Sequence, residues 1–325
     1  MQANEDCDFM KPNGASELLF IEPSLEALMN QNYQILTSEL FYASSSILGE
    51  GCFWHPHRKT FFWIDIEERR LSEIDTSGKQ VNFWVMPQRI GTAVPVQENP
   101  NNLLVALQDG LAVLDLETGY LEWLMDLEKD LPDNRANDGK CDGNGRLWLG
   151  TMGVKAQDGV GSLYRIKGTE AQKMLSNLTI SNGMAWSANN RFYFIDSPTK
   201  RIDSYLFASE AGNIEFEKTV IEVPDDLGLP DGMTIDEEGM LWVAHWDGFA
   251  VCRWNPNTGE LLAKIVVPVP QVTCCAFGGK DLQTLIITTA KKELSHGDLA
   301  KYPLSGHLFT VQVDVKGLEI NLFKK

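Results

Sequence analysis

Short runs of apolar residues recur along the chain at a nearly constant spacing. Their first residues lie 42, 44, 45, 49 and 44 positions apart. A period of roughly 40–50 residues built from short strands is typical of the blades of a β-propeller. The pattern therefore predicts six blades in one ring, and so one large domain rather than two. The six runs are Phe61–Asp65, Leu103–Leu107, Leu147–Thr151, Phe192–Asp196, Leu241–His245 and Leu285–Thr289.

Within one period, apolar stretches alternate with turn residues in a way that predicts four strands. The fifth period reads GMTID, MLWVAHW, AVCRWN and ELLAKIVV, with EEG, DGF and PNTG between them. Glycine, asparagine and proline between such stretches are typical of antiparallel hairpins. We therefore expect an all-β fold, a six-bladed β-propeller with four-stranded antiparallel blades.

The last period lacks one strand. It offers clear strands only at 274–278, 284–289 and 307–313, whereas the segment YQILTSELF at Tyr33–Phe41 has no period of its own. We predict that this N-terminal strand becomes the outer strand of the sixth blade and closes the ring. Residues 1–30 would then be an N-terminal extension, with a helical pattern at Pro23–Asn30, and residues 31–325 would be the propeller.

Charge and composition narrow the class of protein. The 325 residues include 28 Lys and Arg against 45 Asp and Glu, a net charge of −17. This balance argues against a nucleic-acid-binding face and against docking on anionic lipid. No apolar run reaches membrane-spanning length, and the polar first residues are unlike a signal peptide. The six cysteines form no C-x-x-C pair, which indicates scattered buried thiols. We expect a cytoplasmic protein, a monomer by default with a dimer as the alternative.

Four of the six periods carry a carboxylate or amide at one phase of the repeat. Counting back from the aromatic residue of the second strand, three of them lie eleven positions away and one lies twelve. Each has a glycine within the next two positions, which permits a bulge at the start of a strand. The four residues are Glu50, Asn137, Asn182 and Asp231; the same count leads to Ala93 and Cys275 in the other two periods.

First strands of propeller blades line the axis, so these four side chains are expected to converge there. Two carboxylates and two amides would repel or stay unsatisfied at the axis unless something bound them. An all-oxygen set suits a hard divalent cation such as Ca²⁺, Mg²⁺ or Mn²⁺, and Zn²⁺ or Fe²⁺ remain as alternatives. The competing interpretation is that Asn-Gly and Asp-Gly are ordinary turn dipeptides.

At these residues the sequence resembles the SMP-30/gluconolactonase/LRE-like family, which includes regucalcin, sugar lactonases and luciferin-regenerating enzyme. The matching segments are LGEGCFW, RANDGKCD, LWLGTM, SNGMAWS, LPDGMTIDEEGMLWVA and VTCCAFGGKDLQTLIITTA, spread from about residue 45 onward. The resemblance implies a six-bladed propeller with one divalent metal ion on its axis, Ca²⁺ being the first choice. It implies that Glu50, Asn182 and Asp231 bind the metal and that Arg135 and Asn137 contact the substrate.

The resemblance further implies a carboxylic-ester hydrolase that opens an aldono-lactone, such as gluconolactone, to the aldonic acid. The metal would polarise the carbonyl and activate water, with Asp231 as general base and Glu50 beside it. His245, at the end of a second strand, is a further candidate for substrate binding. Lys155 stands where animal relatives carry a carboxylate, so their sugar preference does not transfer.

Two other functions compete with this one. A non-enzymatic calcium-binding regulator would use the same ligands, and a luciferin-regenerating or phosphotriesterase-type hydrolase would use the same propeller and metal. Turnover of a lactone would separate these classes.

Overall fold

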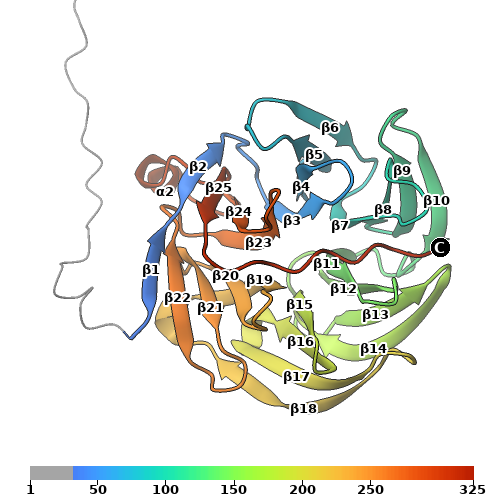
Figure 1. The fold of residues 1–325 in the computed structure, drawn as a ribbon. Helices are drawn as coiled ribbons and strands as arrows, with labels where there is room; N and C mark the ends of the chain where they lie inside the picture. Colours follow the sequence, from blue (N-terminus) through green and yellow to red (C-terminus); the bar gives the residue numbers. More distant parts are fainter. Residues whose placement is uncertain (1–31) are drawn as a thin grey trace, which may run out of the picture. The chain divides into compact units, whose positions relative to one another are not determined.

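Each predicted period folds into one antiparallel sheet whose strands run in chain order from the axis to the rim (Figure 1). The computed structural model describes residues 32–325, so the predicted extension at 1–30 and its helical pattern at Pro23–Asn30 lie outside the described residues. Six sheets around one axis confirm the all-β, six-bladed β-propeller with four-stranded antiparallel blades.

The strands of the six blades have the following bounds. Blade one holds β3 (Gly49–His55), β4 (Thr60–Asp65), β5 (Arg70–Ile74) and β6 (Val81–Val85). Blade two holds β7 (Ile90–Pro95), β8 (Asn102–Leu107), β9 (Gly110–Asp115) and β10 (Leu121–Asp126). Blade three holds β11 (Asn134–Cys141), β12 (Leu147–Gly153), β13 (Gly161–Lys167) and β14 (Glu170–Leu178). Blade four holds β15 (Ser181–Ser187), β16 (Arg191–Asp196), β17 (Arg201–Ala208) and β18 (Asn213–Glu222). Blade five holds β19 (Leu229–Ile235), β20 (Leu241–Trp246), β21 (Ala250–Trp254), β22 (Leu261–Val266) and β1 (Gln34–Thr37). Blade six holds β23 (Val272–Gly278), β24 (Thr284–Thr289), β25 (Leu308–Gln312) and β2 (Glu39–Tyr42).

The ring closes through the N-terminal segment, but not with one strand. The strand β2 pairs antiparallel with β25 and completes blade six, as predicted. The strand β1 instead pairs parallel with β22 and adds a fifth strand to blade five, so the single strand predicted over Tyr33–Phe41 is wrong. The chain changes blades at Ser38, whose backbone N and Oγ both donate to the carbonyl of Val266. The outer edge of β22 offers unpaired backbone groups, and β1 satisfies them.

The apolar core is divided into layers between neighbouring blades. Six buried clusters exist in the described chain, and each draws its side chains mainly from two adjoining blades. Trp148 of β12, for example, packs on Phe192 of β16 with ring centroids 5.0 Å apart. Because the hydrophobic burial lies between the sheets, the axis is left for the polar residues of the first strands.

The C-terminal segment after β25 runs from blade six toward blades two and three (Figure 1). Gly317 forms a bridge with Asp236 of blade five, and Phe323 forms a parallel bridge with Val96 of blade two. Phe323 is fully buried. This segment joins blades that the ring places apart, a feature the repeat pattern does not predict.

Helical structure is sparse in residues 32–325. It comprises the helix α2 (His296–Lys301) and two 3-10 turns, η1 (Ser197–Thr199) and η2 (Asp225–Leu227). The helix α2 starts with a capping box between Ser295 and Asp298 and is too short to produce a helical period in the sequence. None of these helices is long and apolar enough to cross a bilayer.

Candidate metal and substrate site

The repeat position that carries the four polar residues coincides with a break in strand pairing near the start of the first strand of a blade. The pairing with the second strand breaks directly after Glu50 in β3, and it breaks at Asn137 in β11, Asn182 in β15 and Asp231 in β19. A bulge turns side chains out of the regular alternation, and here it lets the residue face the axis.

In blades two and six the equivalent positions are Gly91 and Thr273, not Ala93 and Cys275. The breaks fall between Ile90 and Thr92 and between Val272 and Cys274. The count from the second strand was wrong there because the hairpins of these blades are two residues longer than those of blades three to five. The four polar side chains thus share the axis with a glycine and a threonine.

A cavity of about 580 Å³ opens at this point. Its wall includes all five predicted site residues that come from the first strands. These are Glu50, Arg135, Asn137, Asn182 and Asp231. Trp246, Met152 and Leu229 add apolar surface to the same wall. The structure therefore brings together, in one open cavity, the residues that the sequence placed in four different blades.

A chain of hydrogen bonds fixes the amide of Asn182. The hydroxyl of Ser197 donates to the carbonyl of Pro230 at 2.6 Å, so its oxygen can only accept from Asn182 Nδ2, 2.8 Å away. Asn137 Nδ2 then donates to Asn182 Oδ1 at 3.0 Å. The amide oxygen of Asn182 therefore lies on the side of Asn137, with a lone pair left for a ligand.

Two of the cavity carboxylates, the partly buried Glu50 and the buried Asp231, are unfavourable in their charged forms. Burial, followed by the charge of Asp138, raises the pKa of Glu50 to about 8. Burial and the charge of Glu50 raise the pKa of Asp231 well above its ordinary value. Asp231 Oδ1 is buried and has no hydrogen-bond partner within residues 32–325.

These residues fit a divalent cation. An orphaned carboxylate oxygen, a second, partly buried carboxylate and an oriented amide oxygen form an all-oxygen donor set for a hard ion. Within the described range no group of three or more His, Cys, Asp or Glu side chains is arranged to hold a metal. A cation here would therefore depend on the amide of Asn182 as its third protein ligand.

Arg135 is held rigidly beside this set. Its Nη1 donates to Asn137 Oδ1 at 2.6 Å and to the carbonyl of Ala136 at 2.9 Å. Only 5% of the residue is exposed, and burial lowers its pKa to about 10, so it remains a cation at neutral pH. Its Nε and Nη2 form no hydrogen bond with the described residues, which leaves donors for a bound molecule.

His245 lies elsewhere. It is fully buried, its Nε2 accepts from the indole of Trp254 at 3.4 Å, and burial lowers its pKa to about 3. It is not among the residues that line the cavity, so we leave it out of the proposed site.

Two residues near the centre carry no clear signal in the sequence. Ser197 comes from the turn η1 and orients Asn182, and no repeat phase marks it. Asp138 is a partly buried carboxylate next to Asn137, and desolvation raises its pKa. Asp138 belongs to the motif Asn137-Asp138-Gly139. The count along the repeat does not select it, because it takes one axial residue from each blade, and in this blade that residue is Asn137.

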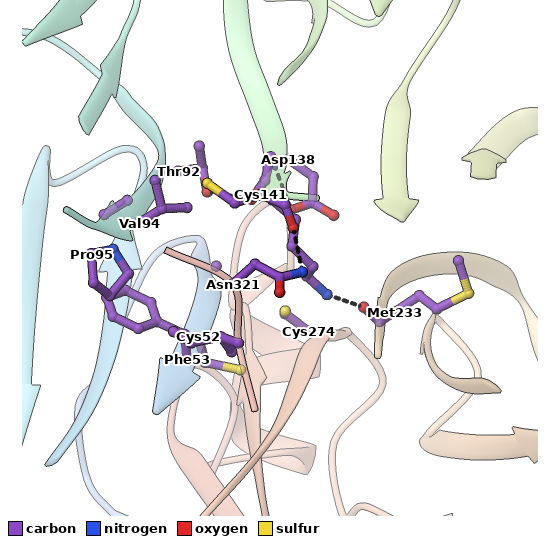
Figure 2. Close-up of a pocket in the computed structure, with 15 residues that line it drawn as sticks. Cys52, Phe53, Thr92, Val94, Pro95, Asp138, Cys141, Met233, Cys274 and Asn321 are labelled. Atoms are coloured by element: carbon purple, nitrogen blue, oxygen red, sulfur yellow. Dashed lines mark hydrogen bonds between the residues drawn. The ribbon is translucent and has the colours of Figure 1, made fainter. Parts of the chain in front are cut away.

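Asp138 lines a second, smaller pocket of about 40 Å³ (Figure 2). Residues of the same first strands line this pocket, slightly further along the chain than the axial residues. Cys52 lies two positions after Glu50, and Met233 lies two positions after Asp231. The C-terminal segment contributes Asn321, whose Nδ2 donates to the carbonyl of Cys141 at 3.1 Å (Figure 2). All five cysteines within residues 32–325 are buried and free, as the sequence predicted for scattered thiols.

The chain is similar to known proteins over most of its length. A family model described as the SMP-30/Gluconolactonase/LRE-like region matches residues 48–291. A Bacillus subtilis (strain 168) protein named "Putative sugar lactone lactonase YvrE" is 34% identical over 84% of this chain and 94% of its own. Bos taurus regucalcin is 33% identical over 83% and 92%. The crystal structure of a calcium-binding protein, regucalcin, from Agrobacterium tumefaciens superimposes with a TM-score of 0.86 at 30% identity, covering 91% of this chain and all of that one. On this coverage the chain belongs to the SMP-30/gluconolactonase/LRE-like family.

Proposed function

We propose that this protein is a metal-dependent sugar lactonase that hydrolyses an aldono-lactone to the aldonic acid. The observation that carries the proposal is the pair of carboxylates, partly buried Glu50 and buried Asp231, in the wall of an open cavity that also presents Arg135. Family membership and the lactonase name of the Bacillus subtilis relative support it. The reaction would be that of a carboxylic-ester hydrolase of EC class 3.1.1.

Glu50, Asn182 Oδ1 and Asp231 would hold one divalent cation. Ca²⁺ is the first choice because all three ligands are oxygens, with Zn²⁺, Mg²⁺, Mn²⁺ and Fe²⁺ as alternatives. When bound, the ion supplies Lewis acidity toward the lactone carbonyl oxygen. The two carboxylates would balance its charge, and the ion would offset both the burial and the charge of Glu50 that raise the pKa of Asp231.

Asp231 would act as the general base. Its carboxylate accepts a proton from the water that adds to the lactone carbonyl carbon, forming one C–O bond. When the bond from that carbon to the ring oxygen breaks, the same proton passes to the ring oxygen, which becomes a hydroxyl. The product is an aldonic acid that ionises at neutral pH.

Arg135 and Asn137 would orient the sugar. The guanidinium donates in a fixed plane, and its bond to Asn137 Oδ1 prevents it from turning away. Holding the lactone against Asp231 in this way reduces the entropy lost on reaching the transition state.

A metal titration with a substrate panel tests the proposal. Purified protein is stripped with EDTA, its melting temperature and lactonase rate are measured, and Ca²⁺, Zn²⁺, Mg²⁺, Mn²⁺ and Fe²⁺ are added singly. We expect EDTA to abolish hydrolysis of glucono-, galactono-, xylono- or arabinono-lactone and to lower the melting temperature, and one ion to restore both.

Other results would select another function. Metal-dependent stabilisation without turnover of any lactone would favour a calcium-binding regulator. Turnover restricted to an organophosphate or a luciferin-type ester would favour the other hydrolases.

We also propose a cytoplasmic location and a monomeric state. The five free cysteines of the described chain suit a reducing compartment. Size-exclusion chromatography with light scattering would detect a dimer directly.

A further inference from the structure

Outside the proposed metal ligands, the cavity wall is positively charged although the chain carries a net charge of −17. Apart from Glu50 and Asp231, which a divalent cation would neutralise, the wall contains four cationic and two anionic side chains, a net charge of +2. These are Arg89, Arg135, Lys155 and Lys292 against Glu67 and Glu293. A concave site of one sign concentrates ligands of the opposite sign.

One part of this charge comes from three neighbouring blades. Glu67 of blade one accepts from Arg89 Nε of blade two at 3.0 Å and from Lys292 Nζ of blade six at 2.8 Å. One carboxylate therefore neutralises only one of the two cations that it holds in place. The three side chains line the cavity and are between 19% and 34% exposed, so the remaining charge lies at the cavity wall.

Lys155 supplies the other part, from blade three. It follows β12, and its backbone N–H donates to Gln157 Oε1 at 3.1 Å, which shapes the loop. Its ammonium group makes no hydrogen bond or ion pair with the residues that the structure describes. A cation without a partner in the cavity wall is available to a ligand at no cost in broken ion pairs.

We infer that the substrate carries an anionic substituent, a carboxylate or a phosphate, at a position remote from the lactone carbonyl. The inference rests on the proposed function, since the carbonyl end is assigned to the metal ligands and Asp231, and Arg135 is assigned to the sugar. Lys155 binds the anionic group, and the excess charge of Arg89 and Lys292 strengthens the attraction. A neutral sugar lactone would leave these charges unused, because hydroxyl groups are recognised equally well by neutral donors.

Binding of product-like acids tests the inference independently of turnover. Calorimetric titrations of the Ca²⁺-loaded protein compare gluconate, which has one carboxylate, with glucarate and 6-phosphogluconate, which carry a second anionic group at the far end. We expect glucarate and 6-phosphogluconate to bind at least about tenfold more tightly than gluconate. Lys155→Glu should lower that ratio by roughly tenfold, because exposed charge pairs contribute modestly and a reversal counts twice. The glucarate and phosphogluconate ratios show which anionic group is preferred.

The control variant is Lys218→Glu, which makes the same change in net charge on the exposed outer strand β18. It should leave both ratios unchanged. Lys155→Gln should give an intermediate ratio and excludes an effect of the new carboxylate itself.

Equal affinity for the three acids in the unaltered protein would overturn the inference. So would a preference for glucarate and 6-phosphogluconate that Lys155→Glu does not reduce, because the second anionic group would then bind elsewhere. Either result leaves the lactonase proposal standing if neutral lactones are hydrolysed. Absence of all lactone turnover, with the binding ratios as expected, would reject the lactonase proposal and keep the anion subsite.

Discussion

Asn137 Nδ2 donates to Asn182 Oδ1 at 3.0 Å and thereby links the first strands of blades three and four at the axis. Asn137 also accepts from Arg135, so one amide connects the proposed substrate-binding arginine to a proposed metal ligand. Because the Asn182 amide is held at both its nitrogen and its oxygen, its orientation depends on neighbouring side chains as well as on any ligand. Such supporting contacts are expected to tune metal affinity.

Ser197→Ala tests this dependence. It removes the acceptor of Asn182 Nδ2, so the amide can rotate and present nitrogen to the metal. We expect metal affinity, measured by calorimetry, to fall roughly 10- to 100-fold with little change in secondary structure. Ser305→Ala is the matched control, since Ser305 is a buried serine whose hydroxyl has no partner in the described chain. Unchanged affinity in the Ser197 variant would show that Asn182 is not oriented by this bond.

Asp231→Asn should separate folding from turnover. The variant keeps the shape of the side chain but cannot accept a proton, so the lactonase rate should fall roughly 10²- to 10⁴-fold. Circular dichroism should remain that of the unaltered protein. Hydrolysis of gluconolactone at the original rate would remove Asp231 from its assigned role.

Glu50→Gln should raise the stability of the metal-free protein at alkaline pH. The pKa of Glu50 is about 8 in the fold, whereas the ordinary value of 4.5 applies to the unfolded chain. Between these values the folded protein holds a proton that the unfolded chain has lost. Stability of the metal-free protein therefore falls as pH rises from 4.5 to 8, by at most about 1.4 kcal/mol per pH unit.

Urea unfolding between about pH 5 and pH 8, with EDTA present, measures the effect. Glu50→Gln should flatten the pH dependence of the unfolding free energy. Added Ca²⁺ should stabilise the unaltered protein at the alkaline end of this range, but it should not stabilise the variant. A variant less stable than the unaltered protein at that end would mean that the carboxylate contributes to the fold itself.

Two buried histidines predict a loss of stability in mild acid. Burial lowers the pKa of His55 to about 4 and that of His245 to about 3, below the ordinary value of 6.5. Below pH 6.5 these histidines therefore bind protons in the unfolded chain but not in the folded protein. The free energy of unfolding falls as the pH drops below 6.5. Each histidine contributes at most about 1.4 kcal/mol per pH unit. In His245→Gln, the unfolding free energy between about pH 6.5 and pH 5 should change less steeply, by the equivalent of about one proton taken up on unfolding. An unchanged slope would contradict the lowered pKa of His245.

A buried ion pair between hairpin residues of blade three should be important for stability. Asp142 accepts from Arg146 Nε at 2.7 Å and from the indole of Trp148 at 2.8 Å, and its side chain is fully buried. Asp142→Ala leaves the buried guanidinium unpaired and should cost about 3–5 kcal/mol in the free energy of unfolding. Asp75→Ala, in an exposed turn, is the control and should change stability far less. Equal effects of the two substitutions in urea titrations would argue against this role.

Truncation tests how the ring closes. Removal of residues 1–31 should leave the cooperative melting transition in place, because the strands that complete blades five and six begin at Gln34. Removal of residues 1–42 takes away β1 and β2, exposes the edges of β22 and β25, and should lower the melting temperature sharply or cause aggregation. A large loss of stability already in the shorter truncation would contradict the predicted boundary near residue 30.

The sequence by itself determined the number of blades and the four polar residues that line the axial cavity. Both follow from local periodicity: a blade is built from contiguous chain, so Trp148 and Trp242 recur with the repeat and mark the position of Asn137 and Asp231 before them. Tertiary structure alone decided what depends on contacts between blades. Three features depend on contacts between residues that the repeat does not relate. They are the change of blade at Ser38, the packing of Phe323 against blade two and the orientation of Asn182 by Ser197. The shifted phase at Gly91 and Thr273 has a different, local cause, because a hairpin two residues longer changes the count without changing the apolar pattern.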